Sequence, residues 1–157
     1  MARAADTRAP AEVLRELLER VVAGFALAAQ VDVEDDGETV TGTLHGGDLG
    51  LFIGRHGQTI DAVQHLAVRT IQNTEAGRER RVVVDAEGYR KRRAEILCRQ
   101  ADEAAEQAVK YSRPVALDAM TPGERRLVHE YLRDRGDVET YSEGEEPDRH
   151  LIVAPLK

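Results

Sequence analysis

The stretch Ile53-Gly54-Arg55-His56-Gly57-Gln58-Thr59-Ile60 places two basic residues between two glycines. Apolar residues then recur at the spacing of an α-helix. Before the stretch, Asp48 can cap a short apolar helix over residues 49–53. Glycine reaches backbone angles that are closed to other residues and lets another backbone approach closely. The Gly-x-x-Gly pattern therefore predicts a tight joint between two helices, the second carrying Ile60, Val63, Ala67 and Ile71 on one face.

A joint of this kind can bind a phosphate. The loop amides and the N-terminus of the second helix would face the same space, and Arg55 and His56 add donors and positive charge. An ordinary helix–helix turn is the competing interpretation of the tetrapeptide, so the rest of the chain has to decide between the two.

Composition limits the class of protein. The 157 residues suffice for one domain or two small ones, and 41% apolar with 4% aromatic residues predicts aliphatic cores. The single cysteine, Cys98, excludes an internal disulfide and fits a reduced, cytoplasmic setting. The most apolar stretch, residues 21–29, is too short to span a bilayer, so no membrane segment is expected.

Charge is unevenly distributed along the chain. The net charge of -7 argues against non-specific binding of duplex DNA, which depends on phosphate neutralisation. Residues 51–99, however, hold 10 basic and 6 acidic side chains and form the only net-positive third of the chain. This third contains the Gly-x-x-Gly loop, and the local field decides where an anion binds.

The first half of the chain predicts a regular order of elements. Residues 1–9 are expected to be a disordered lead-in, and Pro10 opens an amphipathic helix. Alternating residues predict strands at 29–34 and 39–44, joined by an Asp36-Gly37 hairpin. After the two helices around the loop, residues 81–84 predict a third strand.

Residues 10–87 resemble a type II KH domain in the order of their elements: helix, strand, strand, helix, Gly-x-x-Gly, helix, strand. The resemblance implies a three-stranded sheet with helices packed on one face. It also implies a groove that clamps about four single-stranded nucleotides. Ile53 and Ile60 would either line an apolar floor under the bases or pack in the core, and the sequence leaves both open.

The resemblance also assigns roles to the loop residues. Gly54 and Gly57 would shape the loop, while Arg55 and His56 would contact phosphate. Gln58, which directly follows the loop, completes this part of the predicted nucleic-acid site.

A long connecting helix is expected over residues 88–112, with its helical pattern running about 33 Å from residue 89 to 110. Its narrow stripe of small residues suggests weak packing on one or both domains. Four cations, residues 90–93, crowd its N-terminus, where the helix dipole disfavours positive charge. They form either a solvated face or a path for phosphates.

The remaining residues predict a second domain at 113–157. Thr121-Pro122-Gly123-Glu124 is a helix start with a capping box. Arg125 and His129 lie at i and i+4 on the following helix, with Arg126 near them, and two strands follow at 138–142 and 149–153. This pattern resembles an R3H domain, which implies that Arg125 holds a phosphate and His129 stacks or donates beside it.

KH followed by R3H on one short chain resembles the bacterial Jag family, also called SpoIIIJ-associated, EloR or KhpB. The expected fold class is α+β, with two small α/β-sheet domains joined by a long helix. The resemblance implies post-transcriptional regulation linked to cell elongation and division, a chaperone role, and a small single-KH protein as partner. Many members carry an additional N-terminal domain, whereas about nine residues precede the first helix here.

The leading hypothesis is a cytoplasmic single-stranded RNA-binding protein without catalytic residues, metal or cofactor. No surface aromatic clusters are expected, which suggests limited base stacking and so a modest sequence preference. The alternatives are single-stranded DNA binding, a hydrolase using His129 with Glu130 or the acidic turn, and a protein-interaction adaptor that forms a homodimer. The five histidines show no metal-ligand spacing, and Cys98 has no evident activating base.

Overall fold

The structure is a computed structural model that describes residues 6–156. The chain divides into two units between Tyr89 and Arg90. Each unit is built from helices and one three-stranded sheet. Each unit has its own hydrophobic core. This architecture confirms the predicted α+β class with two small α/β-sheet domains.

The first unit has the predicted order of elements. Pro at the first helical position opens α1, and the cap at its start comes without a side-chain hydrogen bond. The elements are α1 (Pro10–Gly24), β1 (Ala29–Asp35), β2 (Thr39–Gly46), α2 (Gly50–Ile53), the single 3-10 turn η1 (Arg55–Gly57), α3 (Gln58–Ile71) and β3 (Arg81–Ala86).

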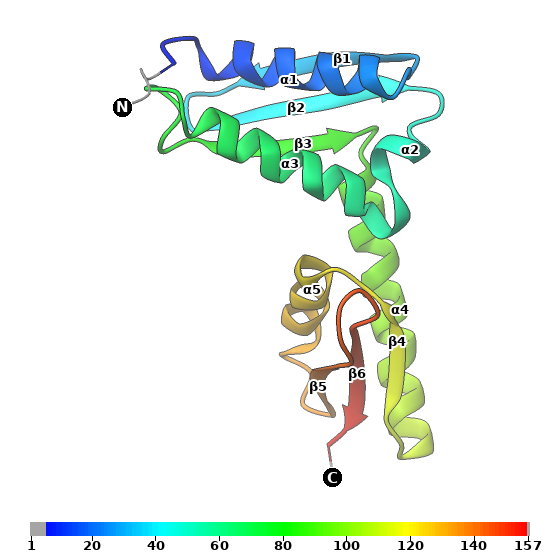
Figure 1. Ribbon diagram of the computed structural model, residues 1–157. Coiled ribbons are helices and arrows are strands. Elements are labelled where there is room, and N and C mark those ends of the chain that lie inside the picture. Colours follow the sequence, from blue (N-terminus) through cyan, green and yellow to red (C-terminus); the bar gives the residue numbers. More distant parts are fainter. Residues whose placement is uncertain (1–5, 157) are drawn as a thin grey trace. The chain divides into compact units, whose positions relative to one another are not determined.

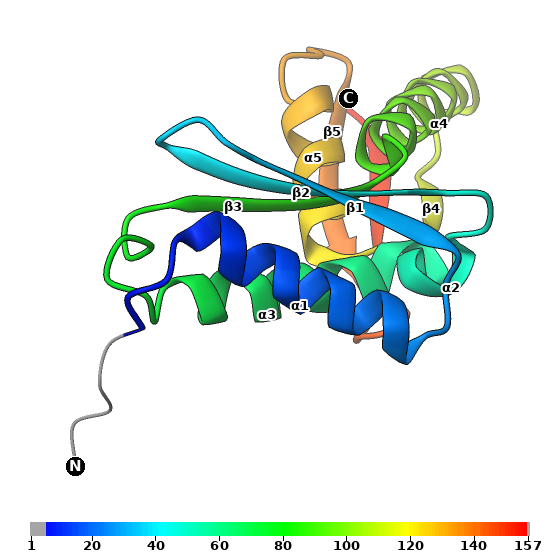
Figure 2. The same ribbon diagram turned by 90° about the horizontal axis from the view of Figure 1, so that it is seen from above.

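The first sheet has the strand order β1-β2-β3, with β1 antiparallel and β3 parallel to the central strand. The Asp36-Gly37 hairpin is confirmed, because the Asp36 carboxylate accepts from the amides of Glu38 and Thr39 at 2.9 and 2.7 Å. Helices α1 and α3 cover the same face of the sheet (Figure 1, Figure 2). Alternate strand residues therefore point into the core, and Val40, Leu44 and Val84 are fully buried.

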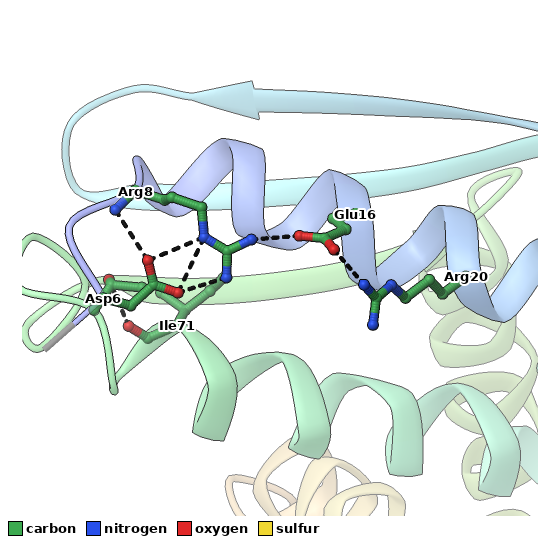
Figure 3. Close-up of polar contacts among 6 residues, drawn as sticks. Asp6, Arg8, Glu16, Arg20 and Ile71 are labelled. Carbon is green, nitrogen blue, oxygen red and sulfur yellow. Dashed lines mark hydrogen bonds and ion pairs between the residues drawn. The ribbon is translucent and has the colours of Figure 1, made fainter. Parts of the chain in front are cut away.

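The lead-in to α1 is only partly described. Residues 1–5 lie outside the described residues, but residues 6–9, also expected to be disordered, make defined contacts. The Glu75 amide donates to the Asp6 carbonyl at 3.1 Å. Arg8 donates to the Asp6 carboxylate, which lowers the pKa of Asp6 to about 2, and pairs with Glu16 on α1 (Figure 3). Glu16 also accepts from Arg20 at 2.6 Å.

The second unit contains the long helix and the second sheet. Its elements are α4 (Tyr89–Tyr111, whose first residue belongs to the first unit), β4 (Val115–Ala119), α5 (Pro122–Leu132), β5 (Val138–Glu143) and β6 (His150–Pro155). The sheet is antiparallel, in the order β4-β6-β5. The small residues of α4 are not a weakly packed stripe. Five of its side chains are buried in this core: Leu97, Ala101, Ala104, Ala105 and Ala108.

No helix within residues 6–156 has both the length and the apolar character needed to cross a membrane.

Candidate nucleic-acid interface

The Gly-x-x-Gly segment forms a single tight turn between α2 and α3 (Figure 1). Three of its residues have positive φ: Gly54 at 73°, His56 at 54° and Gly57 at 78°. The Gly57 amide donates to the Gly54 carbonyl at 3.3 Å, and the Gln58 amide donates to the Arg55 carbonyl. These two amides are therefore engaged within the turn.

Both glycines are required by their surroundings as well as by their φ angles. A Cβ on Gly54 would lie 2.2 Å from Thr59 Oγ1 and 2.9 Å from the Thr59 backbone nitrogen. A Cβ on Gly57 would lie 3.0 Å from the hydroxyl oxygen of Tyr89. The loop is thus packed against its own helix on one side and against a tyrosine on the other.

The side chains of the turn differ in exposure. Arg55 and Gln58 are exposed, and His56 is half-buried. In the described part of the chain, Arg55 forms no ion pair, so its guanidinium is available to an anion. The sequence brings these residues to one turn, as expected.

The apolar floor expected beneath the bases is only partly available. Ile60 is fully buried and belongs to the first core, so the core alternative is correct for this residue. Ile53 is half-buried and packs against the same core. Leu51 on α2, which the sequence reading did not select, is 60% exposed three residues before Gly54. The sequence offers no signal that separates it from its apolar neighbours on this short helix.

The basic start of α4 is not simply a solvated face. Arg93 Nε donates to Glu124 Oε1 at 2.6 Å, with both side chains largely buried. Glu124 also completes the predicted capping box, accepting from the Thr121 amide at 2.9 Å while its own amide donates to Thr121 Oγ1 at 3.3 Å. At least one of the four cations, Arg93, therefore forms a largely buried ion pair within the protein.

Arg125, predicted to hold a phosphate, is 9% exposed and already has two partners. One terminal nitrogen donates to the Met120 carbonyl at 2.7 Å, and the other donates to Glu146 Oε1 at 2.6 Å. Glu146 belongs to the acidic turn between β5 and β6. In this state Arg125 ties the start of α5 to that turn.

Beside Arg125, an open depression of about 410 Å³ lies between α5 and β5. Its wall includes all three predicted residues of α5, Arg125, Arg126 and His129, of which Arg126 and His129 are exposed. His129 Nδ1 lies 2.5 Å from Thr140 Oγ1. Arg126 donates to Glu130 at 2.8 Å, and this hydrogen bond raises the pKa of Arg126 and lowers that of Glu130. The depression can receive an anionic or planar group next to three basic side chains, one of which, Arg125, is already paired with Glu146.

Tyr141 also lines this depression, and the sequence reading missed it. Its side chain is 47% exposed, and exposed tyrosines also occur at 111 and 131 in the same unit. The second unit therefore offers single exposed aromatic side chains, and the expected absence of surface aromatic clusters stays a prediction. An exposed tyrosine on β5, the strand beside the helix of the predicted Arg-x-x-x-His pair, was the available signal.

No metal site accompanies these residues. Within residues 6–156, no group of three His, Cys, Asp or Glu side chains is placed to hold an ion.

Comparison with known proteins gives the same domain order. Residues 11–87 match the KH domain of KhpA/KhpB, and residues 95–155 match the R3H domain. The chain is similar to proteins named RNA-binding protein KhpB from three bacteria. It is 38% identical to that of Clostridium symbiosum over 141 residues, which cover 88% of this chain and 63% of the relative. It is 35% identical to that of Lactiplantibacillus plantarum over 156 residues, which cover 99% of this chain and 48% of the relative. It is 31% identical to that of Bacillus subtilis over 147 residues, which cover 92% of this chain and 70% of the relative.

The chain thus spans about half to two thirds of the length of these relatives. The matches cover both units, in the order that the structure has, and include the turn at 54–57 and the α5–β5 depression. The chain belongs to the KhpB family, with a KhpA/KhpB-type KH domain followed by an R3H domain.

Proposed function

We propose that this protein binds single-stranded RNA without acting as an enzyme, and that the KH turn makes the principal phosphate contact. The observation that carries the proposal is the exposed Arg55 guanidinium, held on a turn whose backbone angles need two glycines and which is packed against Thr59 and Tyr89. A fixed turn loses little conformational freedom on binding. The relatives are named RNA-binding protein KhpB, which supports RNA as the ligand class.

The R3H depression supplies a second, weaker contact. Arg126 and His129 would meet a phosphate, and the Tyr141 ring would stack on a base. Two weak sites on one chain give an avidity above either single affinity when one RNA reaches both.

The family resemblance extends the proposal to a role in the cytoplasm. The proposed role is post-transcriptional regulation linked to cell elongation and division, with chaperone activity. The proposed protein partner is a small single-KH protein or a second copy of this chain.

Equilibrium binding to a short unstructured RNA across a salt series tests the proposal. Replacing Arg55 and His56 together by Asp should weaken binding by more than tenfold at low salt and flatten the salt slope by about 0.7 to 1.4, one to two phosphate contacts. Arg126→Ala with His129→Ala should have a smaller effect. Arg55→Asp alone and Arg69→Asp each change the formal charge by two units, so Arg69→Asp is the matched charge control for the loop.

Arg69 is exposed on the same helix, α3, about 17 Å along the axis from Gln58. The loop variant and this control are compared at the physiological-salt end of the series, where the separation exceeds the Debye length of about 8 Å. If the loop variant and Arg69→Asp lose the same affinity for RNA, the loss reflects general electrostatics and not a specific contact of the loop. Competition by DNA of the same sequence separates RNA from DNA binding. If wild type binds neither nucleic acid, the adaptor hypothesis takes its place, and light scattering tests its dimer.

A further inference from the structure

The ring of Tyr89 lies directly under the KH turn. A methyl group built on Gly57 would be 3.0 Å from the Tyr89 hydroxyl oxygen and 3.1 Å from Cε1, inside ordinary van der Waals contact. Gly57 is buried, and Tyr89 is half-buried and packs against the first core. The ring therefore fills the space into which the backbone of the turn could otherwise relax.

The segment that presents Tyr89 is itself fixed. Glu87 and Gly88 both have positive φ, 48° and 68°, so the chain turns sharply between β3 and the first residue of α4. The Glu87 amide donates to the Leu44 carbonyl at 3.0 Å, and its carboxylate accepts from the Gly46 amide at 3.0 Å. Because β2 holds this turn at two points, the ring has little freedom to retreat from Gly57.

We propose that Tyr89 is a positioning residue for the KH turn. Its ring confines Gly57, and with it the conformation in which Arg55 and His56 are offered to phosphate. The proposal rests on the proposed function, because it assigns a residue to that same binding site. Confinement before binding lowers the entropy cost of ordering the turn on the RNA. A tyrosine that only fills the core would affect stability and not this step.

A double-mutant cycle between Gly57→Ala and Tyr89→Ala tests the contact directly. In the wild-type background the new methyl meets the ring and also imposes a side chain at φ 78°, so Gly57→Ala should weaken RNA binding by about tenfold or more. In the Tyr89→Ala background the ring is absent, and the same substitution should weaken binding by only about threefold. Tyr89→Ala alone should weaken binding by about three- to tenfold.

Two further variants and a second readout keep the test decisive. Tyr89→Phe keeps the ring and should bind within about twofold of wild type, since only the hydroxyl is lost. Tyr89→Leu keeps apolar volume without reaching Gly57, and replaces Tyr89→Ala in the cycle if that variant does not fold. Amide hydrogen exchange at His56 and Gly57 should accelerate in the Ala or Leu variant, without RNA present.

Equal Gly57→Ala penalties in both backgrounds, or unchanged exchange and affinity on loss of the ring, would overturn the role of Tyr89 while leaving RNA binding intact. Failure of the wild-type protein to bind RNA would overturn the proposed function and, with it, the role of Tyr89 in binding.

Discussion

Replacing Arg125 by Ala should damage the fold of the R3H domain more than it damages the RNA site. The Arg125 guanidinium is nearly inaccessible and bridges the Met120 carbonyl to Glu146. Removing it leaves a buried carbonyl without a donor and releases the acidic turn from α5. The resemblance to an R3H domain implies that Arg125 is a phosphate ligand, so the two interpretations predict different outcomes for this variant.

The expected loss follows from the two contacts. A buried hydrogen bond from a charged donor contributes about 1.5–3 kcal/mol, which applies to the Met120 contact. The Glu146 side chain is 52% exposed, so solvent screening reduces its pair to about 0.5–1 kcal/mol. The free energy of unfolding should therefore fall by about 2–4 kcal/mol. For a domain of this size, that corresponds to a decrease in Tm on the order of 15 °C.

The chain has no Trp, so unfolding is followed by circular dichroism in urea, with residue-resolved hydrogen exchange to separate the two units. Arg126→Ala is the matched control, because this neighbouring side chain is 79% exposed and its loss should leave the midpoint unchanged. The reasoning is refuted if Arg125→Ala unfolds like Arg126→Ala and yet loses RNA binding, since Arg125 would then act on the ligand and not on the fold.

Three further outcomes are expected. Glu146→Gln keeps an acceptor for the Arg125 guanidinium but removes a negative charge beside the α5–β5 depression. RNA should therefore bind about two- to fivefold tighter. Glu145→Gln is the control for net charge, and an equal gain in affinity for that variant contradicts the argument. Gly54→Ala should lower the free energy of unfolding of the first unit by about 2–4 kcal/mol in urea, because φ and the Thr59 backbone both oppose a side chain; a loss below about 1 kcal/mol contradicts it. Hydrogen bonds from two backbone amides lower the pKa of Asp36 below 3.8, so its carboxylate stabilises the hairpin above that pH and stops doing so as pH falls through the lowered value; Asp36→Asn should show a flatter decline in urea midpoint across this acid range.

The fold could be predicted because its signals are local. Helical stripes, the Asp36-Gly37 turn and the capping box of Thr121 each lie within a few neighbouring residues, and all are present in the structure. Their order, together with the Gly-x-x-Gly stretch and the Arg125-x-x-x-His129 pair, carried the resemblance to a KH domain followed by an R3H domain.

The candidate site was harder to predict because its decisive contacts join residues far apart in the chain. Glu146 reaches Arg125 across 21 positions, and Tyr89 meets Gly57 across two elements. Neither contact leaves a periodic trace in the sequence. The burial of Ile60 likewise depends on how the first helix and sheet pack around α3, which a one-dimensional pattern does not contain.

The buried face of α4 bears on where this chain can be cut or grafted. Five of the side chains in the second core precede Pro114, so a chimaera carrying only residues 114–157 would present Val128, Leu132 and Leu151 to water on an open apolar face. Such a face promotes self-association. The smallest portable R3H module of this chain therefore begins near Arg90, and the helix has to travel with it.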